Sequence, residues 1–196
     1  MKVSQIILIV FVAVIGIFGI WGCNSYNSLV NSDENVKKAW ADVESSYQRR
    51  FDLIDNLVAT VKGAAEFEKS TLTEVVEARS KAFDVKIDAN SLTPENIQKY
   101  QAAQGSLSNA LGKLMVLTEN YPSLRATENF TNLQTQLEGT ENRIKTARDN
   151  FNAAVQEYNV KVRRFPTNII AGFGGFEVKE GFKSDEGAEK APKVKF

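Results

Sequence analysis

An unbroken apolar run near the N-terminus is the feature that most restricts what this chain can fold into. Every residue from Ile6 to Trp21 is apolar or glycine, and with its neighbours the run approaches the ~20 residues that cross a bilayer as a helix. Tyr26 follows shortly after, and aromatic side chains favour the membrane interface. The sequence therefore predicts a transmembrane helix over residues 5–23, preceded by a short segment of residues 1–4.

Three interpretations of this run compete: a retained anchor, a lipoprotein signal and a cleaved signal peptide. A lipoprotein signal places a cysteine after a small residue, as in Gly22-Cys23, but both kinds of signal expect a small residue where bulky Trp21 stands. The sequence favours the retained anchor and does not decide whether Cys23 is lipidated. Gly16, Gly19 and Gly22 recur every three residues, which permits close helix approach, although glycine is also tolerated in membrane helices. Basic residues nearly balance across the span, so they predict no orientation.

The composition excludes several function classes. Lysine and arginine number 24, equal to aspartate and glutamate at 24, so there is no basic excess that would attract nucleic acid. The chain has no histidine and one cysteine, which removes the commonest metal ligands and any disulfide within the chain. Since 43% of the residues are hydrophobic, a real core can be buried. We therefore expect no metal, no cofactor and no nucleic-acid partner.

The chain after the span has the apolar spacing of helices. From Val36 to Ala65 apolar residues recur at steps of three and four, and no proline precedes Thr93, so a long helix that continues from the span is predicted. We expect a break near residues 67–70, a shorter helix from Ser70 to Phe83, and a loop over residues 88–92. The first stripe consists of Val36, Trp40, Val43, Tyr47, Phe51, Ile54, Val58, Val61 and Ala65.

Two further helices are predicted in the second half. Thr93 and Pro94 form the clearest helix start, because threonine caps and proline suits the first helical position. That helix should stop before Pro122. A heptad stripe then runs from Phe130 to Phe165, where Pro166 ends it, which is typical of bundle or coiled-coil packing. Its members are Phe130, Leu133, Leu137, Ile144, Ala147, Phe151, Ala154, Tyr158, Val162 and Phe165, with polar Thr140 in the series.

These elements predict an all-α protein, in which an N-terminal transmembrane helix is followed by an antiparallel bundle of the four-helix type. Short connections favour antiparallel neighbours, so residues 24–166 should form three long helices and one shorter helix. Residues 167–196 should form a Gly/Phe segment, which is poor helix material, and a charged, loose tail from Glu177 onward. We expect the segment from Phe173 to Phe176 to pack against the bundle.

A series of short motifs lies in a characteristic order after the span. They are Tyr26-Asn27-Ser28-Leu29-Val30, Ala39-Trp40, Arg49-Arg50-Phe51-Asp52-Leu53-Ile54-Asp55-Asn56-Leu57-Val58, Glu119-Asn120-Tyr121-Pro122-Ser123-Leu124-Arg125-Ala126, Asn129-Phe130, Thr140-Glu141-Asn142-Arg143-Ile144, Ala147-Arg148, Tyr158-Asn159 and Phe165-Pro166. From about Tyr26 to Phe176 the chain resembles the LemA family of bacterial membrane-anchored proteins. The resemblance implies an all-α bundle behind a single span in the inner (cytoplasmic) membrane. The family often has proline where Asp55 stands, so a straighter first helix is expected here.

Two polar clusters are the candidate functional residues. We hypothesise that Arg49, Arg50 and Asp52 face a second cluster around Glu141 across the bundle and that the clusters satisfy one another. Asn56 is a candidate for burial, where an amide fixes helix register. A structural role is favoured over a contact surface for protein or lipid headgroups. The second cluster consists of Glu141, Asn142, Arg143 and Arg148. The full candidate set is Trp40, Arg49, Arg50, Asp52, Asn56, Tyr121, Pro122, Glu141, Asn142, Arg143, Phe165 and Pro166.

No catalytic motif is found in the sequence. It contains neither a GxxxxGK[ST] phosphate loop nor a GxSxG elbow, and its carboxylates are scattered, so we expect no enzymatic activity. The leading expectation is a membrane-anchored scaffold or adaptor whose partners are the lipid bilayer and other membrane proteins or copies of itself. The alternative is a homo-oligomer that assembles by itself and organises or remodels membrane.

Overall fold

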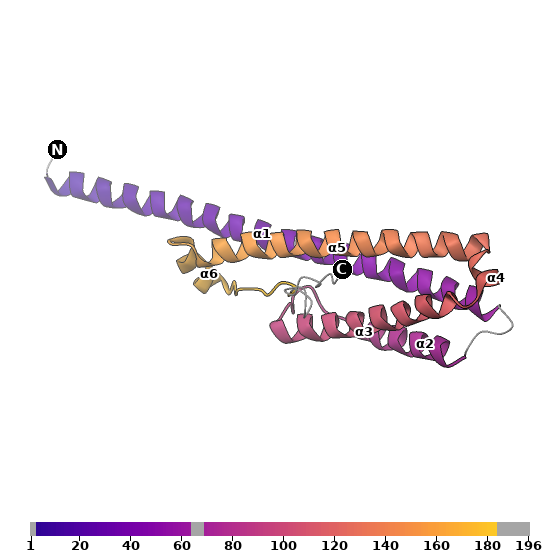
Figure 1. The fold of residues 1–196 in the computed structure, drawn as a ribbon. Coiled ribbons are helices and arrows are strands. Elements are labelled where there is room, and N and C mark those ends of the chain that lie inside the picture. Colours follow the sequence, from indigo (N-terminus) through magenta and orange to yellow (C-terminus); the bar gives the residue numbers. More distant parts are fainter. Residues whose placement is uncertain (1–2, 64–68, 184–196) are drawn as a thin grey trace, which may run out of the picture.

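The prediction of an all-α chain is confirmed. The computed structural model describes residues 3–63 and 69–183, of Leu8 the backbone alone, and these parts contain helices and no strand. The helices are α1 Val3–Lys62, α2 Lys69–Asp84, α3 Pro94–Thr118, α4 Pro122–Arg125, α5 Glu128–Arg163 and α6 Thr167–Gly174 (Figure 1).

The apolar run and the first bundle helix form one continuous helix, as predicted. In Figure 1 the N-terminal part of α1 projects beyond the other helices, and its described side chains up to Ile20 are exposed. Burial on α1 begins at Ser25 and Leu29. By length and composition α1 is able to cross a membrane. The helix also passes through Asp55 without a break, and the Asp55 carboxylate pairs with Arg79 of α2.

The break between α1 and α2 lies earlier than predicted. Helix α1 ends at Lys62, whereas the expected stripe continued to Ala65 and the expected break began at Phe67; both of these residues lie outside the described part of the chain. Helix α2 begins at Lys69, so Ser70 is inside the helix and does not cap it. A periodic apolar pattern marks which face is buried, but it does not mark the last hydrogen-bonded turn.

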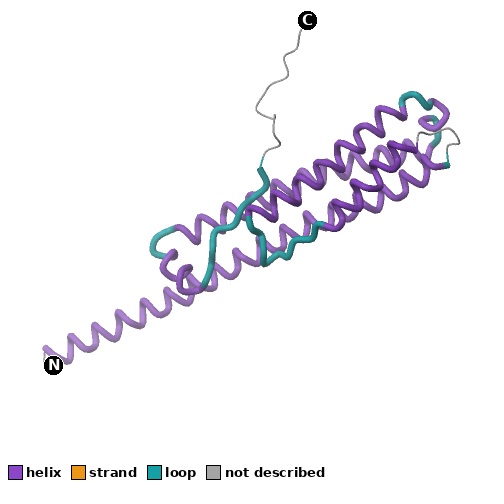
Figure 2. Tube along the Cα trace, turned by 90° about the horizontal axis from the view of Figure 1, so that it is seen from below, coloured by secondary structure: helices purple, strands orange, loops and turns teal. Residues whose placement is uncertain are grey.

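The bundle consists of two antiparallel pairs, α1 with α5 and α2 with α3 (Figures 1 and 2). Thr93 caps α3 as predicted, because its hydroxyl accepts a hydrogen bond from the Asn96 N–H at 3.3 Å. Helix α3 stops at Thr118, before Pro122. Pro122 instead begins α4, a single helical turn. Four residues are too few for the spacing of apolar residues to predict a helix.

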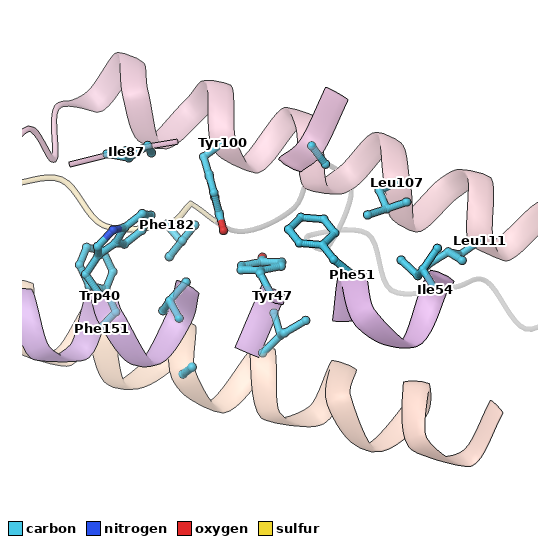
Figure 3. Close-up of a cluster of buried hydrophobic side chains, with 14 of the residues drawn as sticks. Trp40, Tyr47, Phe51, Ile54, Ile87, Tyr100, Leu107, Leu111, Phe151 and Phe182 are labelled. Atoms are coloured by element: carbon cyan, nitrogen blue, oxygen red, sulfur yellow. The ribbon is translucent and has the colours of Figure 1, made fainter. Parts of the chain in front are cut away.

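An aromatic cluster forms the centre of the core (Figure 3). The ring of Trp40 meets Tyr100 and Phe151 edge-on, with 5.4 Å between ring centroids in each case. Tyr47 meets Tyr100 in the same way at 5.2 Å. Edge-to-face packing of this kind adds about 0.5–1.5 kcal/mol per pair beyond the burial of area. Phe182, from the C-terminal segment, stacks on Trp40 at 6.0 Å and completes the cluster.

The C-terminal predictions were partly wrong. Phe165 is 75% exposed, because α5 ends at Arg163 and the heptad stripe does not continue beyond it. The Gly/Phe segment forms α6, which ends where Gly175 adopts a left-handed φ of 71°. In that segment Phe176 is half-buried while Phe173 is exposed. Residues 177–183 were expected to be loose, yet they pack against the bundle through Lys179 and Phe182.

Candidate functional site

A buried arginine joins three helices at the middle of the bundle. Arg50 of α1 is 2% exposed, and its Nε lies 2.9 Å from Oε1 of Glu141 on α5, an ion pair with imperfect hydrogen-bond alignment. Its guanidinium also donates to the Ser108 hydroxyl of α3 at 2.7 Å. Ser108 in turn donates to the Gln104 carbonyl at 3.1 Å. The predicted meeting of the two polar clusters is therefore found for Arg50 and Glu141.

The environment of Arg50 makes its partner important. Burial lowers the pKa of the Arg50 guanidinium, and the nearby Glu141 carboxylate opposes that shift. An arginine stays charged in proteins, so removing its partner leaves a buried, uncompensated charge. A groove of about 380 Å³ opens beside this pair. Its lining residues are Arg50, Ser108, Leu111, Gly112, Met115, Gln134, Leu137, Glu138 and Glu141.

Other members of the two clusters line a shallow surface depression of about 370 Å³, which we call the arginine hollow. Within it Asp52 accepts a hydrogen bond from Gln48 at 2.9 Å. Both Arg49 and Arg143 are exposed. The hollow is lined by Ser45, Ser46, Gln48, Arg49, Asp52, Thr140 and Arg143.

The remaining candidates lie elsewhere. Asn56 is exposed, so the expected burial of its amide is wrong, because its position turns away from the apolar stripe. Asn142 is exposed as well. Arg148 does not join the first cluster; its guanidinium donates to the Lys183 carbonyl at 3.3 Å and lies 4.7 Å from the centre of the Phe182 ring.

The aromatic and proline candidates have structural positions. Trp40 is fully buried in the aromatic cluster. Tyr121 and Pro122 form the turn between α3 and α4, and the Tyr121 carbonyl accepts hydrogen bonds from the Leu124 and Arg125 N–H groups at 3.1 Å each. The pair formed by Phe165 and Pro166 connects α5 to α6.

Sequence reasoning missed a strap formed by residues 175–183, which we call the C-terminal strap (Figure 2). Asn159 of α5 pairs with the main chain of Lys179 in both directions, accepting its N–H at 2.9 Å and donating to its carbonyl at 2.7 Å. Asn152 pairs with the main chain of Phe182 in the same way, at 2.8 and 3.1 Å. Glycine is required at position 181, between Lys179 and Phe182, because a β-carbon there would lie 2.5 Å from Asn152 Oδ1.

The strap fits α5 because the spacing of the two asparagines along the helix matches the spacing of their two partners along the strap. Asn152 and Asn159 are seven residues apart, which is about 10.5 Å along a helix. Lys179 and Phe182 are three residues apart, which is about 10 Å along extended chain. The same interval recurs on α1. There Tyr26 contacts Phe176, with ring centroids 5.5 Å apart, Asp33 contacts Lys179, and Trp40 contacts Phe182.

The central contact of the strap is an ion pair that is largely shielded from water. Lys179 Nζ lies 2.9 Å from Asp33 Oδ1, and the two side chains are 14% and 17% exposed. Partial burial raises the pKa of the Asp33 carboxyl, but hydrogen bonds from Lys179 and Lys37 outweigh burial and hold that pKa below its usual value. Lys179 also lies 5.4 Å from the ring centre of Tyr158, and burial raises the pKa of Tyr158 to about 12.

The described residues contain no group of three or more histidine, cysteine, aspartate or glutamate side chains that could hold a metal ion. The chemistry that they do offer consists of paired ions, amide–main-chain contacts and aromatic packing. A signal for the strap was present in the sequence as the spacing of Phe176, Lys179 and Phe182, but three residues are too few to be distinctive.

The sequence of the chain is similar to those of known proteins. The chain is 28% identical over 179 residues to the magnetosome protein MamQ 2 of Paramagnetospirillum magneticum, covering 81% of this chain and 64% of that protein. It is 28% identical over 178 residues to MamQ of Magnetospirillum gryphiswaldense, covering 80% and 64%. It is 24% identical over 145 residues to Protein LemA of Metamycoplasma hominis, covering 74% and 63%. The chain thus spans a little under two thirds of the length of these relatives.

The model of the LemA family matches residues 39–196, which include α2 to α6 and α1 from Ala39 onward. This match covers most of the chain and contains both polar clusters as well as the C-terminal strap. The chain belongs to the LemA family.

Proposed function

We propose that this protein is a single-pass membrane scaffold whose helical bundle binds other proteins beside an inner membrane. The observation that carries the proposal is the arginine hollow on α1, the same continuous helix that contains the apolar run. Arg49 lies 27 residues after Gly22, which is about 40 Å along a helix. A rigid connection of this kind would hold the hollow at a fixed height above the bilayer.

The hollow indicates the chemistry of the partner. Arg49 and Arg143 outnumber Asp52 there, and arginine favours carboxylates because its planar group forms two parallel hydrogen bonds. These polar side chains are exposed and contribute nothing to the core, whereas Arg50 on the same helix is buried and paired. We therefore propose an acidic segment of another membrane-associated protein as the partner.

Photo-crosslinking in native membranes tests the scaffold. A photoreactive residue at Ser45 should capture a specific protein, and Arg49→Glu with Arg143→Glu should abolish that capture. Lys145→Glu is the matched control, because it reverses an exposed charge two residues from Arg143 on the same helix. Equal capture by both variants, or no capture at Ser45, would overturn the proposal.

Self-assembly is a second candidate function. Gly16 and Gly19 have nothing within 4 Å of the position that a β-carbon would occupy, so their side of α1 is open to a second copy. Small residues let membrane helices approach closely. To distinguish self-assembly from the scaffold, the mass and the protein content of the full-length complex are measured after extraction in mild detergent. A large particle of this chain alone supports self-assembly, and a fixed ratio with a second protein supports the scaffold.

We also propose that the chain has no catalytic activity of its own. This proposal is supported by the absence of histidine from the sequence and by the engagement of acidic side chains, such as Asp33 and Glu141, in ion pairs with lysine and arginine. Turnover that disappears on one carboxylate substitution, in a variant that keeps its helical content and melting temperature, would contradict it.

A further inference from the structure

Helix α6 has an apolar face that nothing in the described structure covers. Ile169 and Phe173 are four residues apart on α6, so they share one face of the helix, and they are 48% and 89% exposed. Phe165 lies in the turn that precedes α6 and is 75% exposed. Apart from the apolar run, Phe173 and Phe165 are the most exposed large hydrophobic side chains described. The opposite side of α6 is packed, since Ala171 is buried and Ile170 is half-buried.

The position of α6 shows what lies opposite this face. Helix α6 packs against α1 and α5, and a β-carbon built on Gly22 would lie 3.8 Å from Ile170 Cδ1. Gly22 directly follows the apolar run of Ile6 to Trp21. Figure 1 shows α6 at the end of the bundle from which the N-terminal part of α1 projects. If α1 spans the bilayer, α6 lies at the level where the helix leaves the hydrocarbon.

The neighbours of α6 have the chemistry of a membrane interface. Arg163 and Arg164 are exposed and directly precede Phe165, where they would meet lipid phosphates. Trp21 is half-buried, and Tyr26 is 46% exposed on α1. Aromatic residues of this kind concentrate where a span meets the headgroups. Water is a poor solvent for exposed Phe165 and for the face formed by Ile169 and Phe173, whereas the boundary between headgroups and acyl chains suits such apolar side chains.

We propose that α6 is a second membrane contact, which lies in the bilayer interface with Phe165, Ile169 and Phe173 among the upper acyl chains. The inference rests on the proposed membrane anchoring. Two separate attachments on α1 and α6 would prevent the bundle from swivelling about the span. They would thereby fix the direction in which the arginine hollow faces.

Depth-resolved fluorescence tests the proposal on the full chain in vesicles of phosphatidylcholine and phosphatidylglycerol. With Cys23→Ser as background, the environment-sensitive dye NBD is attached to a single cysteine introduced as Phe173→Cys, Ile15→Cys or Val116→Cys. Val116 is the matched control, because it is an apolar side chain, 67% exposed, on α3 near the opposite end of the bundle. Phe173 is almost fully exposed, so its replacement should leave the melting temperature unchanged.

The expected result is a graded one. NBD at residue 173 should emit at shorter wavelength than at residue 116 and be quenched most by nitroxides at a shallow acyl position. NBD at residue 15 should be quenched most by deep nitroxides. If residue 173 behaves like residue 116 while residue 15 is quenched, α6 does not touch lipid. A blue-shifted but unquenched probe at residue 173 means that protein covers α6, which also overturns the proposal. Loss of quenching at residue 15 would instead refute the membrane anchor itself.

Discussion

Arg50 links the α1–α5 pair to α3 through polar contacts. It is a charged side chain that is 2% exposed, and it contacts α3 through Ser108 and α5 through Glu141. Replacing a buried ion pair by apolar residues is often neutral, but removing one partner is costly. We therefore expect the pair to select one alignment of α1 against α3 and α5 more than it adds stability.

A double-mutant cycle tests this role. Arg50→Ala should lower the free energy of unfolding by about 3 kcal/mol, because a buried, paired side chain is lost. Glu141→Ala should cost a comparable amount, about 3 kcal/mol, because it leaves the charge of Arg50, which is 2% exposed, without its partner. We expect coupling of at least ~0.5 kcal/mol in urea denaturation of the double variant. Strictly additive effects would show that the two side chains do not act together.

The Asp33 carboxylate makes attachment of the strap depend on pH. Its pKa is lower in the folded chain than the ordinary value of 3.8, so the ion pairs with Lys179 and Lys37 stabilise the fold above that value. The stabilisation is lost as the pH falls through the lowered pKa and Asp33 takes up a proton. Asp33→Asn should therefore lower the melting temperature by roughly 2–4 °C at neutral pH.

Melting curves across the acidic range check the sign of this effect. The difference between the natural chain and Asp33→Asn should shrink as the pH falls below 3.8, because both then lack the charge. Asp42→Asn serves as the control, since Asp42 is an exposed acid on the same helix. A difference that stays constant with pH would exclude the ion pair as its cause.

At the level of the helices, unequal lengths explain why the strap is needed. Helix α5 has 36 residues and α3 has 25, so α5 is about 54 Å long and α3 about 38 Å. The α2–α3 pair therefore leaves one part of the α1–α5 pair uncovered, and the aromatic rings of Trp40 and Phe151 would be open to water at its edge. The strap covers that part and adds Phe182 to both rings.

Removing the asparagine clamps should release the strap without unfolding the bundle. In Asn152→Ala the N–H of Phe182 loses its acceptor, and in Asn159→Ala the N–H of Lys179 does. Each loss should cost about 1–2 kcal/mol locally, so exchange of that amide hydrogen with solvent should accelerate roughly tenfold. Asn142→Ala, on the exposed side of α5, is the control. Unchanged exchange at residues 179 and 182 would mean that other contacts hold the strap.

Across the molecule as a whole, α1 has two parts in different environments: an exposed apolar part and a part that is packed in the bundle. Its first part buries nothing against the bundle, and its second part provides much of the core from Leu29 to Val61. The bundle therefore gains its stability from contacts after the apolar run. Because α1 is one helix without a break, it holds the bundle in a fixed position relative to the apolar run; such a helix resists bending more than a flexible linker does.

A shortened chain tests this division. A variant that begins at Gly22 keeps the contact between α1 and α6 and loses the apolar run. In the same mild detergent its cooperative unfolding temperature should stay within about 3 °C of the full chain, because no core contact is removed. Circular dichroism during heating measures this. A fall of more than ~10 °C would show that the run stabilises the bundle directly.

Local signals in the amino-acid sequence were sufficient to define most of the helices, because helical periodicity, caps and proline stops act over short distances. The apolar spacing from Val36 to Val61, the cap at Thr93 and the stop before Pro122 each depend on residues within a few turns. The meeting of Arg50 with Glu141 was also foreseeable, since charges on apolar helices need partners. The exposure of Asn56 could not be foreseen, because small differences in helix rotation decide whether a residue beside the apolar stripe is buried.

Long-range packing, by contrast, set the conformation of residues 165–183. Their sequence has no sustained period, so local preference is weak and the surface that they meet determines their path. Helix α6 is held by its packing on α1 and α5 and by the left-handed turn at Gly175. The strap is ordered because Asn152 and Asn159 on α5 match its main-chain spacing. Contacts between segments far apart in sequence leave only a weak local signal, here the spacing of Phe176, Lys179 and Phe182, and for that reason the C-terminal strap could not be predicted.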